Sequence, residues 1–136
     1  MLKPQHNNLP RYSKAFLSFS VMDIEKASRF YTKTLGLRTE QNHENVLILL
    51  LAGDTEVVVY EKKTHEPAAF TLLNFPVEDV ELALYKLKAK GLEFLIDEHD
   101  LKTDKLGIFR NPNGSDMAWF KDPSGNILAL IEQKLM

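Results

Sequence analysis

Apolar and polar residues alternate with two different periods along this chain, and each period marks a different kind of element. Residues 16–21 carry an apolar side chain at every second position, which is the period of a β-strand with one buried face. Asp23 follows as a candidate N-cap, and apolar residues then recur at helical spacing as far as Leu35, before Gly36. The pattern therefore predicts a strand followed by a capped helix over 23–35.

The same pattern occurs a second time. The segments "FSVMDIEKA" and "FPVEDVELA" begin at residues 19 and 75, so the two copies are 56 residues apart. In the second copy, the strand ends at Val77, Asp79 is the candidate cap and Gly91 the candidate stop, which predicts a helix over 79–90. The chain is therefore a tandem repeat of a strand-helix unit.

Three strand-like runs follow each predicted helix. The Pro, Asn and Gly residues of "NPNG" and "DPSGN" are those that tight turns require. The runs cover 37–43, 45–52 and 55–62 in the first half, and 93–97, 107–119 with a turn inside it, and 126–134 in the second. The predicted fold class is α+β, with two tandem βαβββ modules. The chain divides into an N-terminal arm at 1–12, module one at 13–62, a linker at 63–67 and module two at 68–134.

The composition excludes several classes of function. With 136 residues, 44% hydrophobic and 26% charged, the chain is long enough for one domain with a real core. A net charge of -2 gives no basic field for nucleic acid or anionic membranes. No segment approaches the roughly 18 apolar residues of a membrane helix, and no cysteine is present for disulfides or thiolate metal sites. These features favour a cytoplasmic location.

Three segments together resemble a known family. They are "SFSVMDIEKASRFYTKTLGL", its repeat "FPVEDVELALYKLKAKGLEF", and "MAWFKDPSGNILALIEQ" near the end. In these segments the chain resembles the glyoxalase, bleomycin-resistance and extradiol-dioxygenase superfamily, also called vicinal oxygen chelate proteins. The resemblance implies two modules whose sheets curl into a shared cup around a cavity, with the helices outside, and it implies a homodimer.

The resemblance also implies where a divalent metal would bind. Metal-using members place histidine or glutamate ligands on the first and last strands of each module, facing the cavity, where the metal polarises a substrate with adjacent oxygens. The matching positions here are Phe16, Leu72, Ala129 and, with its register less certain, Val57. None of these side chains can hold a divalent ion. We therefore expect no metal and no other cofactor.

The four histidines are the other candidate metal ligands. Their segments are the N-terminal arm for His6, the "EQNHEN" turn for His43, the linker for His65 and the "DEHDLKTD" segment for His99. All four are interpreted as loop or surface residues, and a metal site relocated to them is the minor alternative. Chemistry of the Ser-His-Asp type is not excluded by spacing, but no motif favours it.

Alternation predicts which side chains line the cavity. The set is mostly apolar with a few hydrogen-bonding groups, which is typical of a small-molecule pocket. It contains Phe16, Ser18, Val57, Val59, Phe70, Leu72, Asn74, Met117, Trp119, Ala129 and Ile131. The same aromatic residues could instead fill the cavity, so the sequence allows two alternatives, an open pocket and a filled core. Trp119 is the residue most expected to touch a ligand.

Three functions follow from this pattern. The first is a binding protein of the bleomycin-resistance kind that takes a small apolar or aromatic molecule without turnover. The second is a metal-dependent lyase or dioxygenase that uses relocated ligands. The third is an interaction module with a vestigial cavity. Since the usual ligands are missing, the sequence favours binding over catalysis.

Overall fold

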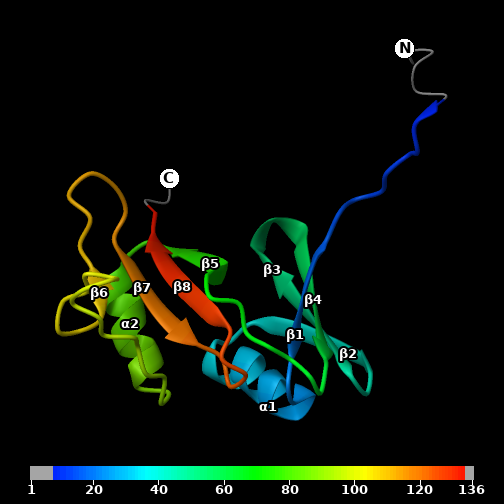
Figure 1. Ribbon diagram of the computed structural model, residues 1–136, viewed down its shortest axis with the longest axis horizontal. Coiled ribbons are helices and arrows are strands. Elements are labelled where there is room, and N and C mark those ends of the chain that lie inside the picture. Colours follow the sequence, from blue (N-terminus) through cyan, green and yellow to red (C-terminus); the bar gives the residue numbers. More distant parts are fainter. Residues whose placement is uncertain (1–7, 134–136) are drawn as a thin grey trace.

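Two four-stranded sheets, one from each half of the chain, form the body of the molecule (Figure 1). The computed structural model describes residues 8–133. In spatial order the first sheet contains β1 (Leu17–Val21), β4 (Thr55–Glu61), β3 (Val46–Leu51) and β2 (Arg38–His43). The second contains β5 (Thr71–Val77), β8 (Ile127–Glu132), β7 (Met117–Lys121) and β6 (Ile108–Phe109). The predicted α+β fold of two βαβββ modules is confirmed.

Each sheet repeats the same pairing. The first strand of a module lies parallel to the last, and the remaining pairs are antiparallel. The first strands, β1 and β5, are therefore edge strands of their sheets. An edge position explains how β5 accommodates Pro76, which has no N–H to donate to a second neighbour.

The two helices begin where their aspartates predict. Asp23 accepts hydrogen bonds from the N–H groups of Glu25 and Lys26 before α1 (Ile24–Arg29), and Asp79 accepts one from Leu82 at the start of α2 (Val80–Lys88). Both caps are confirmed. Gly36 and Gly91 have φ values of +73° and +94°, the left-handed conformation in which glycine ends a helix. Among the described residues, no helix is both long and apolar enough to cross a membrane.

The first helix does not continue as a regular α-helix to Leu35. After Arg29 it becomes a π-helical turn, η2 (Phe30–Thr34), in which the N–H of Leu35 donates to the carbonyl of Phe30 at 3.0 Å. Such a turn holds one residue more than an α-helical turn. The apolar spacing predicts a helix here, but not the change of period inside it. A short 3₁₀ turn, η3 (Ala52–Asp54), joins β3 to β4.

The expected strand over 93–97 is wrong. Only Phe94 forms an isolated bridge, to Phe120, and the N–H of Leu95 donates to the carbonyl of Trp119 at 2.8 Å. The chain then turns away from the sheet. The carboxylate of Asp97 fixes this turn because it accepts hydrogen bonds from the N–H groups of His99 and Asp100, both at 3.0 Å. Local side-chain to backbone hydrogen bonds thus compete successfully with the sheet.

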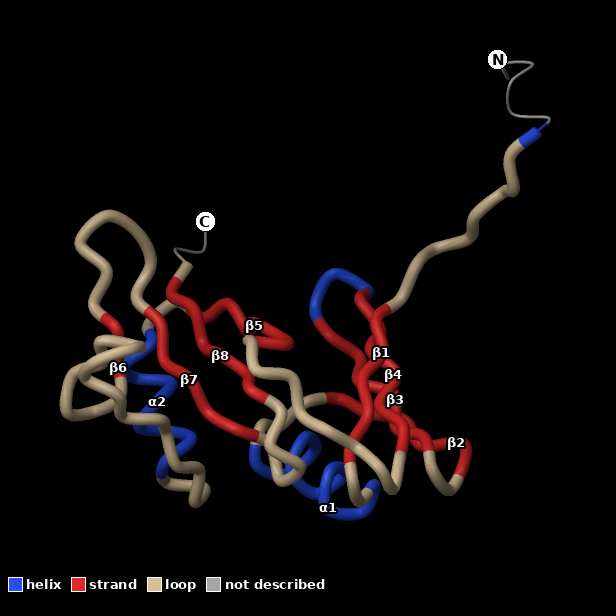
Figure 2. The backbone as a smooth tube through the Cα atoms, in the orientation of Figure 1, coloured by secondary structure: helices blue, strands red, loops and turns tan. Residues whose placement is uncertain are grey.

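One hydrophobic core extends through both modules. In Figures 1 and 2, which share one view, α1 is seen at the lower edge between the two sheets, and α2 is seen next to β6 and β7. Buried side chains from α1, α2 and both sheets belong to a single cluster. At the junction the ring of Phe30 lies 6.3 Å from that of Phe120, which belongs to module two.

Candidate functional site

The candidate site lies on the face of each sheet that points away from its helix, which we call the open face. In paired strands, residues in register share a face. In the first sheet, the open face therefore carries Ser18, Ser20, Ile48, Val58 and Tyr60. In the second it carries Thr71, Asn74, Phe109, Met117, Trp119, Ala129 and Ile131. The predicted facing of Ser18, Asn74, Met117, Trp119, Ala129 and Ile131 agrees with this register.

Trp119 and Ala129 form the centre of the open face in module two. Ala129 is fully buried and lies in register with Asn74 on one neighbouring strand and Trp119 on the other. The indole Nε1 of Trp119 donates to Oγ1 of Thr71 at 3.1 Å, and its ring lies 6.3 Å from that of Phe109. The hydrogen bond and the ring contact hold the indole in one orientation, as a flat apolar platform.

The expectation that Val57 and Val59 face the cavity is wrong. They pair with Leu17 and Phe19 of β1 and are buried in the core beneath α1. Val58, between them, faces the open side. Because Ser18 pairs with Val58 as Asn74 pairs with Ala129, Val58 is the counterpart of Ala129 in module one. The sequence shows the alternation of β4 but not its phase, since every residue from 57 to 59 is valine.

Leu72 also differs from its predicted placement. The pairing of β5 with β8 shifts register between Thr71 and Leu73, so Leu72 lies at a β-bulge. It packs against the core cluster. Thr71 takes the open-face position instead and receives the hydrogen bond from Trp119. Counting seven residues back from Asp79 misses this extra residue.

The open face is not enclosed within a single chain. Phe16 and Phe70 lie just before β1 and β5, and these residues are 64% and 66% exposed. Tyr60 is 40% exposed. The structure therefore places both phenylalanines at the rim rather than inside a closed pocket.

His65 is not the surface residue that its linker position predicts. It is only 8% exposed, and its Nδ1 lies 2.6 Å from Oγ of Ser20 in a hydrogen bond. His43 and His99 are exposed as expected, and His6 lies outside the described residues. No linker pattern marks His65 as buried, because its partner lies 45 residues away in the sequence.

A buried carboxylate joins the two modules close to this histidine. Asp122 accepts hydrogen bonds from the hydroxyl of Tyr31 at 2.6 Å and from Nδ2 of Asn126 at 2.9 Å. Asn126 also donates to the backbone carbonyl of Ser20 at 3.0 Å. Burial, followed by the charge of Asp122, raises the pKa of Tyr31, so the phenol stays protonated as a donor.

The residues at the expected metal positions do not fit a divalent ion. Phe16, Leu72 and Ala129 offer no oxygen or nitrogen side-chain ligand, and correcting Val57 to Val58 changes nothing in this respect. Among residues 8–133, no three side chains of His, Asp or Glu come close enough together to hold a metal. The nearest carboxylate in β4 belongs to Glu56, which lies two residues before Val58 in the strand and is exposed.

The fold and the residue pattern agree with a comparison against known families. A profile of the Glyoxalase/Bleomycin resistance protein/Dioxygenase superfamily matches residues 15–130. The chain belongs to this superfamily. No protein among the curated sequences matches it.

Solved structures give the same fold. A glyoxalase/bleomycin resistance protein from Streptomyces sp. CB03234 is 25% identical, with a TM-score of 0.63 over 88% of this chain and 100% of that one. TnmS3, an antibiotic binding protein from the same organism, is 23% identical, with a TM-score of 0.65 over 92% and 100%. The fosfomycin resistance protein FosX from Listeria monocytogenes is 15% identical, with a TM-score of 0.69 over 93% and 97%. At these identities the last two similarities show the fold alone.

Proposed function

We propose that the protein binds a small apolar or aromatic molecule on its open face and does not turn it over with a metal. The observation that carries this proposal is the platform of Trp119, fixed by Thr71 beside the fully buried Ala129. Resemblance to the superfamily places a carboxylate at Ala129 in metal-using members. An alanine there supplies no ligating group, and the neighbouring indole ring of Trp119 is the apolar surface that suits stacking of a planar ligand.

Of the two alternative functions, the metal-dependent one needs a set of ligands that the described residues do not supply. A lyase or dioxygenase of this superfamily uses a metal as Lewis acid, and the expected ligand positions are apolar. TnmS3 is an antibiotic binding protein with the same fold, which supports binding as a use of this scaffold. An interaction module with a vestigial cavity would keep the fold without any small ligand.

Ligand binding is tested by titrating planar aromatic compounds and following the fluorescence of Trp119, the only tryptophan in the chain. We expect saturable quenching by at least one compound. Calorimetry on Trp119→Ala should then show affinity for that compound weakened about two- to tenfold, the value of one aromatic contact. Tyr85→Ala is the matched control because Tyr85 is exposed on α2, away from the open face.

Two results would contradict the proposal. The first is stoichiometric zinc, iron, nickel or manganese in the purified protein together with metal-dependent turnover. The second is binding that Trp119→Ala leaves unchanged. If no compound in the panel binds at all, the vestigial-cavity module is the better description.

We also propose a homodimer, because exposed apolar residues at the rim of the open face need a cover. Phe16 and Phe70 are largely exposed in one chain, and resemblance to the superfamily implies a homodimer that could cover them. Light scattering should give twice the 15.6 kDa mass of the chain, and Phe16→Ser should shift the protein toward monomer. A wild-type mass of 15.6 kDa at micromolar concentration contradicts the dimer.

The cytoplasmic location stays a prediction, which cell fractionation tests.

A further inference from the structure

A second hollow lies on the helix side of the molecule, where the two modules meet. It has a volume of about 320 Å³. Module one supplies one wall through Leu35 and Leu37, and module two supplies the other through β5 and α2. We call this hollow the junction groove. Its main lining residues are Leu35, Leu37, Phe75, Val77, Ala83 and Leu87.

The local structure explains why this groove stays open. The π-helical turn η2 ends at Thr34, so Leu35 and Leu37 leave the helix together and face the second module. On the other side, β5 is an edge strand, and no further strand covers the outer flank of Phe75 and Val77. Both side chains remain only partly buried although they pack against the core cluster. π-helical turns are rare in proteins, and those that occur often lie at functional sites. The position of η2 beside the groove is therefore notable.

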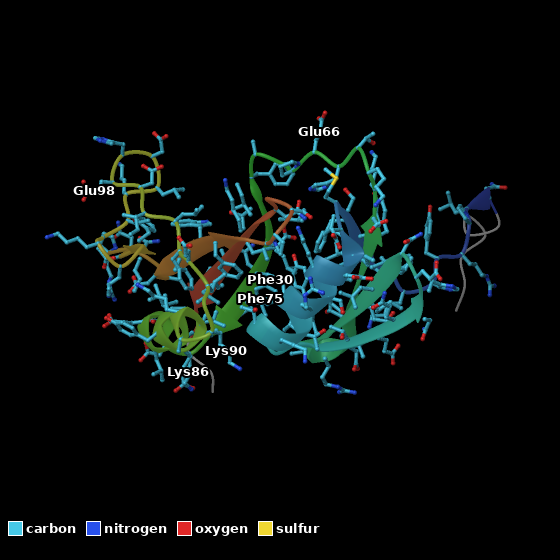
Figure 3. The ribbon with its side chains drawn as sticks, turned by 90° about the horizontal axis from the view of Figure 1, so that it is seen from below. Phe30, Glu66, Phe75, Lys86, Lys90 and Glu98 are labelled. Atoms are coloured by element: carbon cyan, nitrogen blue, oxygen red, sulfur yellow. The ribbon has the colours of Figure 1, made fainter. Side chains whose placement is uncertain are left out.

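Lys86 gives the groove its only charge. It lines the groove from α2, and every other lining residue is apolar. Lys86 makes no ion pair with another described residue, whereas Arg110 on the same module pairs with three carboxylates. Figure 3 labels Phe75 and Lys86 on this side of the molecule. An apolar trough with one free ammonium group at its edge complements a molecule with an apolar body and a single negative head.

We propose that the junction groove binds an apolar monocarboxylate, with the hydrocarbon part between the two modules and the carboxylate at Lys86. Its volume lies at the lower end of the range for small-molecule pockets, so the ligand is an acid with a medium-length chain or a single ring. The site is separate from the open face because Phe75 and Val77 point to the helix side of β5, opposite to Asn74. The proposal therefore does not depend on the function assigned to Trp119.

Calorimetric titration of decanoate into the full-length protein tests the charge. We expect saturable binding, with Lys86→Gln weakening it about two- to fivefold, as the loss of one exposed ion pair predicts. Lys88→Gln is the matched control, since Lys88 also lies on α2 but does not line the groove. Decanol, which has the same chain without the charge, should bind both lysine variants equally well. Equal weakening by the two lysine variants, or no saturable binding, would overturn the proposal.

A filling variant tests the place. Ala83→Phe puts a ring into the groove and should weaken decanoate binding at least about tenfold, while far-UV circular dichroism confirms the fold. An aromatic ligand that quenches Trp119 should still bind this variant, so failure at the groove and failure at the open face give different results. If Ala83→Phe instead lowers the mass seen by light scattering and leaves decanoate binding unchanged, a second copy covers the groove and the proposal is wrong.

Discussion

Tyr31 shows how a single hydroxyl connects the two halves of the chain. It is fully buried in η2 of module one, and its partner Asp122 lies in the turn before β8 of module two. The carboxylate also accepts from the N–H groups of Ser124 and Asn126, both at 2.9 Å. A buried carboxylate is tolerated only when donors surround it, so each donor contributes to the junction.

Removing this hydroxyl should destabilise the protein. Tyr31→Phe keeps the ring but leaves the buried carboxylate of Asp122 without one of its donors. We expect the free energy of unfolding to fall by about 1–3 kcal/mol, measured by urea denaturation. Tyr85→Phe removes an exposed hydroxyl and should change stability by less than about 0.5 kcal/mol. Equal midpoints for the two variants would show that the junction bond contributes nothing.

At this scale the sequence predicts faces better than partners. The register agrees with the predicted facing of Ala129 and Trp119, although apolar residues occupy both sides of β7 and β8. In β4 three consecutive valines hide the phase, and the bulge at Leu72 adds a residue that no alternation shows. The helical spacing around Tyr31 does not reveal its hydrogen bond to Asp122, since that partner is 91 residues away.

At the scale of elements, each helix N-terminus has two carboxylates rather than the one that the sequence predicts. Glu61 at the end of β4 accepts from the N–H of Ile24 at 3.0 Å, beside the cap Asp23. Glu132 at the end of β8 accepts in the same way from Val80. The last strand of each module therefore helps to fix the helix of that module, and negative charge is favourable at a helix N-terminus.

This arrangement predicts an acid-sensitive first helix. The N–H of Lys26 lowers the pKa of Asp23, and the N–H of Ile24 lowers the pKa of Glu61. A folded-state pKa below the unfolded value stabilises the protein above the unfolded pKa, and this contribution is lost as the pH falls through the lowered value. The stability of the wild type should therefore fall between about pH 5 and pH 2.

The matched control replaces both carboxylates by amides. The double variant Asp23→Asn, Glu61→Gln keeps oxygen acceptors at both positions but does not titrate. Urea denaturation at a series of pH values should show a shallower loss of stability in acid for this variant than for the wild type. Parallel curves would mean that other carboxylates cause the acid sensitivity.

The two modules were not equally predictable as sets of elements. In module one, all three strands after the helix lie within one residue of the predicted bounds. In module two, the run 93–97 looks like a strand because of its apolar residues, yet the turn organised by Asp97 removes it from the sheet. The repeat predicts the shared plan, while local polar groups decide where the second copy departs from it.

For the whole molecule, the single core makes the modules interdependent. Phe30 of module one packs against Phe120 of module two, and the buried clusters of both sheets are continuous. The chain should consequently unfold in one cooperative step rather than module by module. Trp119 reports on module two alone, because module one contains no tryptophan. The fluorescence of Trp119 can therefore show whether a substitution in module one also destabilises module two.

Leu49→Ala tests this coupling. Leu49 is fully buried on β3 in register with Val57, and truncating it leaves a cavity in the core of module one. We expect stability to fall by about 2–5 kcal/mol, with the midpoint of Trp119 fluorescence shifting as much as the midpoint of far-UV circular dichroism. Ala89→Gly, a change at an exposed position after α2, controls for handling and should shift both midpoints only slightly. If Leu49→Ala moves the circular dichroism midpoint while the Trp119 midpoint stays in place, the two modules unfold independently.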